Sequence, residues 1–280
     1  MLQTEQESRY DHLEQQSVHE LLAHINAEDQ LVAMAVNRAL PQIERLATAI
    51  VPRMRVGGRL FYVGAGTSGR LGVLDASELP PTFGVPETLV VGIIAGGDRA
   101  LRHAVEHAED DARQGWLDLS AHHPTPQDTV VGIAASGTTP YVVGALSGCR
   151  EHGIPTGCIT SNPDTPLARA ADVAVELAVG PEFVTGSSRM KSGTAQKMVL
   201  NMLSTTLMIQ LGRVQGNRMV NMQLANDKLI ERGTRMLTDT LGMGYDAARR
   251  LLLACGSVEK ALVQARKSTD GNFGHLLQNT

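Results

Sequence analysis

Residues 59–69 read RLFYVGAGTSG, an apolar run that ends in a glycine-rich turn, and a helical pattern follows from Arg70 to Ala76. A buried strand, a turn and a helix in this order form the unit from which parallel sheets are built. Runs of the same kind recur at residues 89–94, 129–134, 156–160 and 173–179. Because they are mostly apolar rather than alternating, we expect five strands of a parallel sheet buried on both faces.

Helical periodicity fills the later intervals, over residues 98–119, 139–152 and 192–211. The sequence therefore predicts an α/β fold, a three-layer α/β/α sandwich around a five-stranded parallel sheet, with ligands bound beyond the carboxyl ends of the strands. The helical spacing of apolar residues within residues 1–56 predicts two or three helices packed on the main domain. The main domain spans residues 57–237. Residues 238–280 predict a small module of three short helices.

The composition excludes several classes of partner. The chain of 280 residues has 25 basic and 29 acidic side chains, a net charge of -4, and so lacks the basic surplus that nucleic-acid binding requires. No apolar stretch is long enough to span a bilayer, and the polar start MLQTEQESRYDHLEQQ does not resemble a secretory signal. Cys149, Cys158 and Cys255 are predicted to be free thiols. We expect a cytoplasmic protein without a membrane or nucleic-acid partner.

The turn from Gly64 to Gly69 matches GxGxxG after a strand and before a helix, which raises the possibility of a dinucleotide site. Such a site needs an acidic residue about 20 positions later, on the ribose hydroxyls. The corresponding stretch around residues 89–91 is apolar, and Asp98 lies too far along the chain. A nicotinamide cofactor is therefore the weaker interpretation, and we expect no cofactor.

Three hydroxyl-rich turns follow strands of the predicted sheet and precede helices. Since the strands are parallel, all three turns meet at one edge, where N–H and O–H donors favour an anion. A phosphate monoester on a small sugar fits three such turns better than a pyrophosphate does. Each turn alone is also typical of an ordinary helix cap. The residues predicted to bind this phosphate are Gly66, Thr67 and Ser68; Ser136, Gly137, Thr138 and Thr139; and Ser187 and Ser188.

Two short motifs suggest other chemistry. His103, Glu106 and His107 match HxxEH, the inverted zincin pattern, but no third ligand is apparent nearby, and we expect no metal site. Ser188 and Lys191 match the SxxK motif of penicillin-binding enzymes, but no KTG element follows. Arg189 and Lys191 are better interpreted as charged donors to a phosphate or carboxylate, or as part of a solvated loop.

Four segments together carry a specific resemblance. They are GAGTSGRLGVLDASELPPTFG, AGGDRALRHAVEHAEDDA, GIAASGTTPYV and VTGSSRMKSGTAQKMVLNMLSTTLMIQLGRVQGNRMV. The chain resembles the sugar isomerase (SIS) domain and, within it, the N-acetylmuramic acid 6-phosphate etherase family. The resemblance implies a lyase that removes the D-lactyl ether of a ring-opened sugar phosphate, in a homodimer without metal or nucleotide.

The resemblance also implies two functional carboxylates, which map onto Glu78 in ASELPPT and Glu109 in HAEDD. Elimination from a sugar aldehyde needs a base for the C2 proton and an acid for the departing oxygen. Glu109 is the candidate base and Glu78 the candidate acid, held near the strand ends by a helix break at Pro80 and Pro81. Many family members have Arg in place of Thr138, which leaves the phosphate contact there open.

Two other classes remain open. A sugar-phosphate isomerase would use the same three turns and one carboxylate base. A non-catalytic sugar-phosphate sensor would need the turns without Glu78 and Glu109. The presence of both glutamates favours an enzyme.

Overall fold

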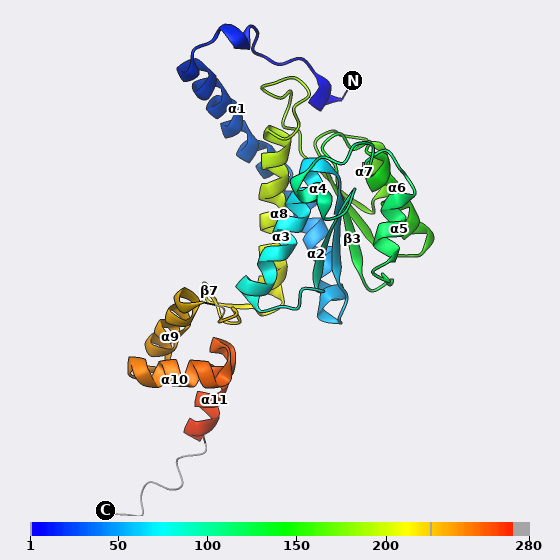
Figure 1. Cartoon of the computed structure of the whole chain (residues 1–280). Coiled ribbons are helices and arrows are strands. Elements are labelled where there is room, and N and C mark those ends of the chain that lie inside the picture. The colour runs from blue at the N-terminus through cyan, green and yellow to red at the C-terminus, as the bar shows by residue number, and fades with distance from the viewer. Residues whose placement is uncertain (1, 225, 271–280) are drawn as a thin grey trace, which may run out of the picture. The chain divides into compact units, whose positions relative to one another are not determined.

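The computed structural model describes residues 2–224 and 226–270, and it contains the predicted five-stranded parallel sheet. The strand order is β2-β1-β3-β4-β5, with all pairs parallel (Figure 1). The five strand predictions are thereby confirmed within a few residues at their ends. The strands are β1 Leu60–Gly64, β2 Val90–Ile94, β3 Thr129–Ile133, β4 Thr156–Thr160 and β5 Val173–Glu176.

Helices cover both faces of this sheet, as a three-layer sandwich requires (Figure 1). One face carries α5, α6 and α7, and the other carries α2, α3 and α8. The N-terminal part contributes two helices, and the first begins at a capping box in which Ser17 and Glu20 satisfy each other's backbone N–H groups. The helices up to α8 are α1 Val18–Arg38, α2 Leu40–Arg55, α3 Gly66–Phe83, α4 Arg99–Arg102, α5 Gln114–Ser120, α6 Pro140–Glu151, α7 Pro166–Ala170 and α8 Lys191–Gln210.

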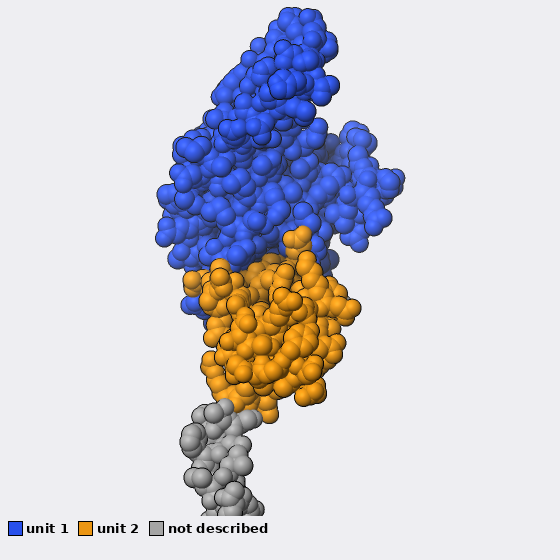
Figure 2. Space-filling model, turned by 90° about the vertical axis from the view of Figure 1, so that its left-hand side faces the viewer, with its two compact units in different colours: residues 1–77, 87–207 blue, residues 78–86, 208–280 orange. Residues whose placement is uncertain are grey.

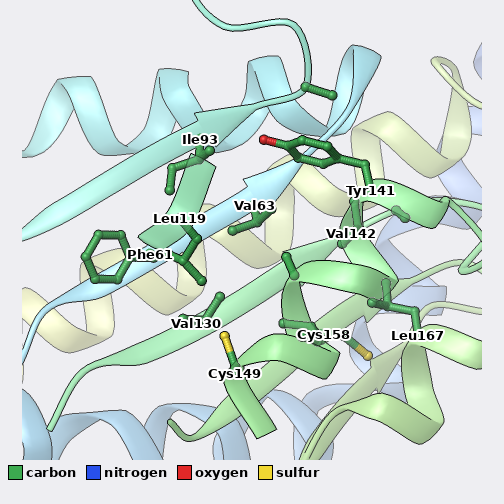
Figure 3. Close-up of a cluster of buried hydrophobic side chains, with 14 of the residues drawn as sticks. Phe61, Val63, Ile93, Leu119, Val130, Tyr141, Val142, Cys149, Cys158 and Leu167 are labelled. Carbon is green, nitrogen blue, oxygen red and sulfur yellow. The ribbon is translucent and has the colours of Figure 1, made fainter. Parts of the chain in front are cut away.

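The core on the α5–α7 face contains both of the fully buried cysteines (Figure 3). Cys149 and Cys158 pack among aromatic and branched side chains such as Phe61 and Leu146. Burial raises the pKa of both thiols to about 12, so they remain protonated near neutral pH. They are free and structural, as predicted, and Cys255 is also free and only partly buried.

Helix α3 lies unusually close to the strands because glycines remove side chains at the contact. A Cβ added at Gly69 would lie 2.8 Å from the Gly64 carbonyl oxygen and 2.6 Å from Ile94 Cγ1. A Cβ at Gly92 would lie 2.5 Å from Val73 Cα. The GxGxxG pattern therefore has a packing role at its first and last glycine, independent of any nucleotide.

Two helix predictions were wrong. The predicted helix over 98–119 is divided into α4 and α5 by an irregular segment, residues 103–113, in which His107 has a φ of +60°. Pro80 and Pro81 do not end α3, which continues to Phe83. Proline's φ fits a helix, and each ring removes only one N–H donor. The Pro81 carbonyl oxygen accepts the backbone N–H of Gln223 at 3.2 Å.

The chain forms two compact units, coloured separately in Figure 2: residues 1–77 with 87–207, and residues 78–86 with 208–280. In the second unit, β6 Val214–Gln215 pairs with β7 Arg218–Met219, and three helices share an apolar core. These helices are α9 Asp227–Leu241, α10 Tyr245–Cys255 and α11 Val258–Asp270. Helix α9, which the sequence placed in the main domain, thus packs with the C-terminal helices. Within the described ranges, no helix is both long and apolar enough to cross a membrane.

Candidate active site

The sheet order creates a crevice beside β1. Strand β1 lies between β2 and β3, so the chain leaves β1 towards one side of the sheet and leaves β3 towards the other. Ligands of open α/β sheets bind at the carboxyl edge where the order reverses in this way. Two of the hydroxyl-rich turns follow these adjacent strands, at residues 65–68 and 134–139. The topology therefore brings the first two predicted loops together.

The first loop begins helix α3. Gly66 has a φ of +52° and is exposed, and Thr67 beside it is half-buried. Ser68 is buried, and its hydroxyl donates to Gln196 Oε1 of α8 at 2.9 Å. The first N–H groups of a helix have no partner within it, so the start of α3 offers donors to an anion. Ser68 holds the loop against α8 rather than presenting a free hydroxyl.

The second loop follows β3 and leads into α6. Gly137 has a φ of +72°, and a Cβ there would lie 2.4 Å from Thr165 Oγ1, so only glycine fits. Thr138 donates its backbone N–H and its hydroxyl to Ser136 Oγ, at 3.2 and 3.1 Å. Thr139 is the N-cap residue of α6, but its hydroxyl does not accept a hydrogen bond from the first turn of that helix. Three hydroxyls thus lie within four residues of a tight turn.

A cavity of about 740 Å³ begins at this loop. Thr138 and Pro140 line one end of it, and Trp116 and Arg113 line the side formed by α5. Trp116, the only tryptophan in the sequence, stacks on His152 at 4.4 Å between ring centroids. The indole therefore lies in the same cavity as the second loop.

The third loop precedes α8 and meets the first. A Cβ added at Gly193 would lie 3.4 Å from Thr67 Cγ2 and 3.6 Å from the Ser188 carbonyl oxygen. Ser187 and Ser188 are half-buried and Arg189 is exposed. Together with the bond from Ser68 to Gln196 of α8, this contact packs the helix that follows the third loop against the first loop.

Glu182 occupies the N-terminus of α8, which sequence reasoning missed. Its carboxylate accepts bonds from the backbone N–H groups of Lys191 at 2.8 Å and Ser192 at 2.9 Å, and the residue is 1% exposed. The next two N–H groups bond to the carbonyl oxygens of Ser188 and Met190. The protein's own carboxylate therefore takes the position that an anion would occupy at this helix. No local signal marks Glu182, because it lies nine residues before the helix.

Lys191 is not exposed to a ligand. It is 1% exposed, and its ammonium pairs with the buried carboxylate of Glu28 in α1. Arg9 approaches the same carboxylate at 3.3 Å. The placement does not support Lys191 as a direct donor to phosphate, and Arg189 is the free cation of this segment.

The two predicted carboxylates have different settings. Glu109 is exposed, and its carbonyl oxygen accepts the backbone N–H of Tyr141 at 3.0 Å, in the first turn of α6. This bond holds the Glu109 segment beside the second loop. Glu78 is exposed in the fourth turn of α3, at the position where that helix passes into the second compact unit. The structure thus brings Glu109 to the loops, and the role of Glu78 stays a prediction.

The HxxEH motif does not form the geometry that zinc requires. His103 and His107 lie in the irregular segment between α4 and α5, not one turn apart on a helix face. His107 instead lies 3.3 Å from the carboxylate of Asp110. In the part of the chain that the structure describes, no three His, Cys, Asp or Glu side chains form a group able to hold a metal ion.

Comparison with known proteins agrees with the fold. Residues 42–150 match the glucokinase regulatory protein N-terminal SIS domain, and residues 103–206 match the SIS domain. A phosphoheptose isomerase of Neisseria gonorrhoeae superposes with a TM-score of 0.53 at 15% identity, covering 68% of this chain and 98% of that one. A phosphoheptose isomerase of Francisella tularensis gives 0.51 at 17% identity, covering 69% and 98%. The chain is a SIS-domain protein.

Closer relatives narrow the assignment. An N-acetylmuramic acid 6-phosphate etherase of Bacteroides fragilis is 66% identical over 259 residues, 92% of each chain. The protein of that name from Symbiobacterium thermophilum is 55% identical over 252 residues, 90% of this chain and 84% of the relative. The chain belongs to the N-acetylmuramic acid 6-phosphate etherase family.

The buried Glu28–Lys191 pair makes a stability prediction. Glu28→Gln leaves the Lys191 ammonium buried without its counter-charge, and we expect a loss of about 3 kcal/mol in the free energy of unfolding. Lys191→Met should cost less, because the remaining Glu28 carboxylate keeps Arg9 as a partner. The double variant should be more stable than Glu28→Gln alone. Chemical denaturation of the three variants measures this, and equal costs for the two single variants would contradict it.

Proposed function

We propose that this protein cleaves the D-lactyl ether of N-acetylmuramic acid 6-phosphate, giving N-acetylglucosamine 6-phosphate and D-lactate. The observation that carries the proposal is the meeting of two hydroxyl-bearing loops at the switch point of the sheet, with Glu109 held beside the second and the helix that follows the third loop packed on the first. High identity to named etherases over nine-tenths of the chain supports the same reaction.

The reaction follows from the chemistry of the open-chain sugar. Ring opening places an aldehyde at C1, so the C2 proton becomes acidic and the lactyl oxygen at C3 becomes a leaving group. Glu109 removes the C2 proton, the electron pair forms the C2–C3 double bond, and the C3–O bond breaks. Glu78 protonates the departing lactyl oxygen. Water then adds at C3 and a proton returns to C2, which gives the product aldehyde.

The phosphate is held by the loops rather than by a metal ion in this proposal. The donors are the start of α3 at Gly66, Thr67 and Ser68, and the turn from Ser136 to Thr139. Ser187, Ser188 and Arg189 complete the set; Ser187 and Ser188 are half-buried, and Gly193 lies close to both Thr67 and the Ser188 carbonyl oxygen. Lys191 contributes indirectly, by fixing the start of α8 on Glu28.

A homodimer is the second part of the proposal. Helix α1 carries an apolar stripe whose later part is buried at Val32 and Val36, while Val18 and Leu22 on the same face are 74% and 63% exposed. Figure 1 shows this first part of α1 projecting beyond the other helices of its unit. Because the stripe continues past the surface that covers it, a second copy of the chain is the partner that we propose.

The cytoplasm is the compartment that we propose, because free buried thiols and a phosphorylated substrate suit it.

Lactate release tests the reaction directly. The purified protein should release D-lactate from N-acetylmuramic acid 6-phosphate in the presence of a strong chelator, and not from the unphosphorylated sugar, because the loops recognise the phosphate. Substrate that binds without lactate release would instead favour a sugar-phosphate isomerase or a sensor.

Glu109→Gln tests the base. The amide keeps the size of the side chain but cannot accept the C2 proton, so solvent exchange at C2 should fall by at least about 100-fold. Affinity for the product N-acetylglucosamine 6-phosphate should change little, because Glu109 is not among the groups proposed to donate hydrogen bonds to the phosphate. Glu106→Gln, an exposed glutamate of the same irregular segment, is the matched control. Retained exchange in Glu109→Gln would remove Glu109 from this role.

Leu22→Glu tests the dimer. A charge in the centre of the exposed stripe should convert the dimer to a monomer in analytical ultracentrifugation. Met34→Glu is the control, because Met34 is 58% exposed but lies on another side of α1. Dissociation by both variants, or by neither, would contradict this surface as the dimer contact.

A further inference from the structure

The segment before α1 is anchored to the candidate site by polar bonds. Thr4, which is 1% exposed, donates its backbone N–H to Asn162 Oδ1 at 3.2 Å. Asn162 Nδ2 donates in return to Thr4 Oγ1 at 3.0 Å. A reciprocal pair of this kind, between residues 158 positions apart, fixes the segment against the end of β4.

Asn162 connects this anchor to the second loop. The same Nδ2 group lies within hydrogen-bond distance of the carbonyl oxygens of Ala135 at 3.0 Å and Ser136 at 3.2 Å. Its two protons are therefore shared among these oxygens and Thr4 Oγ1. The orientation of the Asn162 amide, set by Thr4, controls the backbone that begins the turn from Ser136 to Thr139.

A second anchor reaches the third loop. The Ser8 backbone N–H donates to Thr185 Oγ1 at 2.9 Å. The Ser8 hydroxyl donates to the Phe183 carbonyl oxygen at 2.7 Å. Next in sequence, Arg9 pairs with Glu28, the partner of Lys191.

The distribution of these bonds is selective. Residues 5–7, between the two anchors, are exposed. Apart from a local bond from the Tyr10 backbone N–H to Ser8 Oγ, the side-chain hydrogen bonds found in the described part of the chain join residues 3–8 to Asn162, Phe183 and Thr185. The Tyr10 ring also packs on Phe183, with 5.1 Å between ring centroids, so an aromatic contact adds to the polar bonds at the third loop. The segment bridges two loops that come from different strands.

We propose that residues 2–10 form a strap that sets the distance between the second and third loops, with Thr4 and Ser8 as positioning residues for phosphate binding. The inference rests on the proposed function in one respect, that these loops bind the sugar phosphate. Neither side chain touches the substrate in this proposal: the Thr4 hydroxyl acts through Asn162, and the Ser8 hydroxyl acts through the Phe183 carbonyl oxygen.

Thr4→Val and Ser8→Ala test the strap. Each removes hydroxyl bonds to a loop while keeping the backbone bond, so each should raise the KM for N-acetylmuramic acid 6-phosphate by about three- to tenfold and change kcat less than twofold. The Kd for N-acetylglucosamine 6-phosphate, followed by the fluorescence of Trp116 in the cavity at Thr138, should rise by the same factor. Thr4→Ser keeps the hydroxyl and should restore both constants.

Thr129→Val is the matched control. Thr129 is also a buried threonine, at the opposite end of β3, and its hydroxyl has no hydrogen-bond partner among the described residues. It should leave KM and Kd unchanged. A melting temperature measured for every variant separates folding from positioning.

The outcomes distinguish the two proposals. Unchanged KM and Kd in Thr4→Val and Ser8→Ala would overturn the strap, whether or not the melting temperature falls. Raised constants that Thr4→Ser does not restore would also overturn the role of the Thr4 hydroxyl. If the wild-type protein binds the product but releases no lactate, the etherase proposal fails, and the Kd values of the variants still decide the strap.

Discussion

The close packing of α3 on β1 and β2 is the constraint on which the site depends. A carbonyl oxygen of β1 and a side chain of β2 occupy the space where a Cβ at Gly69 would lie, and the α3 backbone occupies that space at Gly92. The helix can therefore begin within two residues of the end of β1. Its first N–H groups are then placed beside the loop after β3, the neighbouring strand. The glycines matter because they let two backbones approach, and the geometry of the candidate site follows from that approach.

The start of α8 is fixed by charge instead. Glu182 accepts two of its first N–H groups, and Glu28 of α1 neutralises Lys191, so three buried ionisable side chains meet at the start of this helix. Buried charges cost free energy unless they are paired or hydrogen-bonded; Glu28 pairs with Lys191 and Arg9, and Glu182 accepts two backbone N–H groups at the positive end of the helix. These bonds fix the position of the first turn of α8, and so the position of Ser187, Ser188 and Arg189, which directly precede it. The two cations of the segment are thus divided, with Lys191 structural and Arg189 available to a ligand.

The strands, and the edge at which the loops meet, could be predicted because they depend on local patterns. A short apolar run that ends at a turn residue can be recognised without knowing the rest of the chain, and all five runs became strands. The irregular segment 103–113 was missed because its residues have helical character, and tertiary bonds such as Glu109 O to Tyr141 N replace the helix. Glu28, Glu182 and Asn162 were missed for a different reason. Their partners are 9 to 163 residues away in sequence, and no spacing rule links them.

The charge of the candidate site bears on how it can select a substrate. The donors gathered at the sheet edge are hydroxyls and backbone N–H groups, and among the side chains predicted to bind phosphate only Arg189 remains an exposed cation. Neutral donors gain little from long-range attraction, so they discriminate by position rather than by charge. A site of this kind works only if its loops are held at fixed separations. That requirement gives a reason for the polar bonds that hold these loops and the start of α8 in place. They are made by Thr4, Ser8, Ser68 and Glu182.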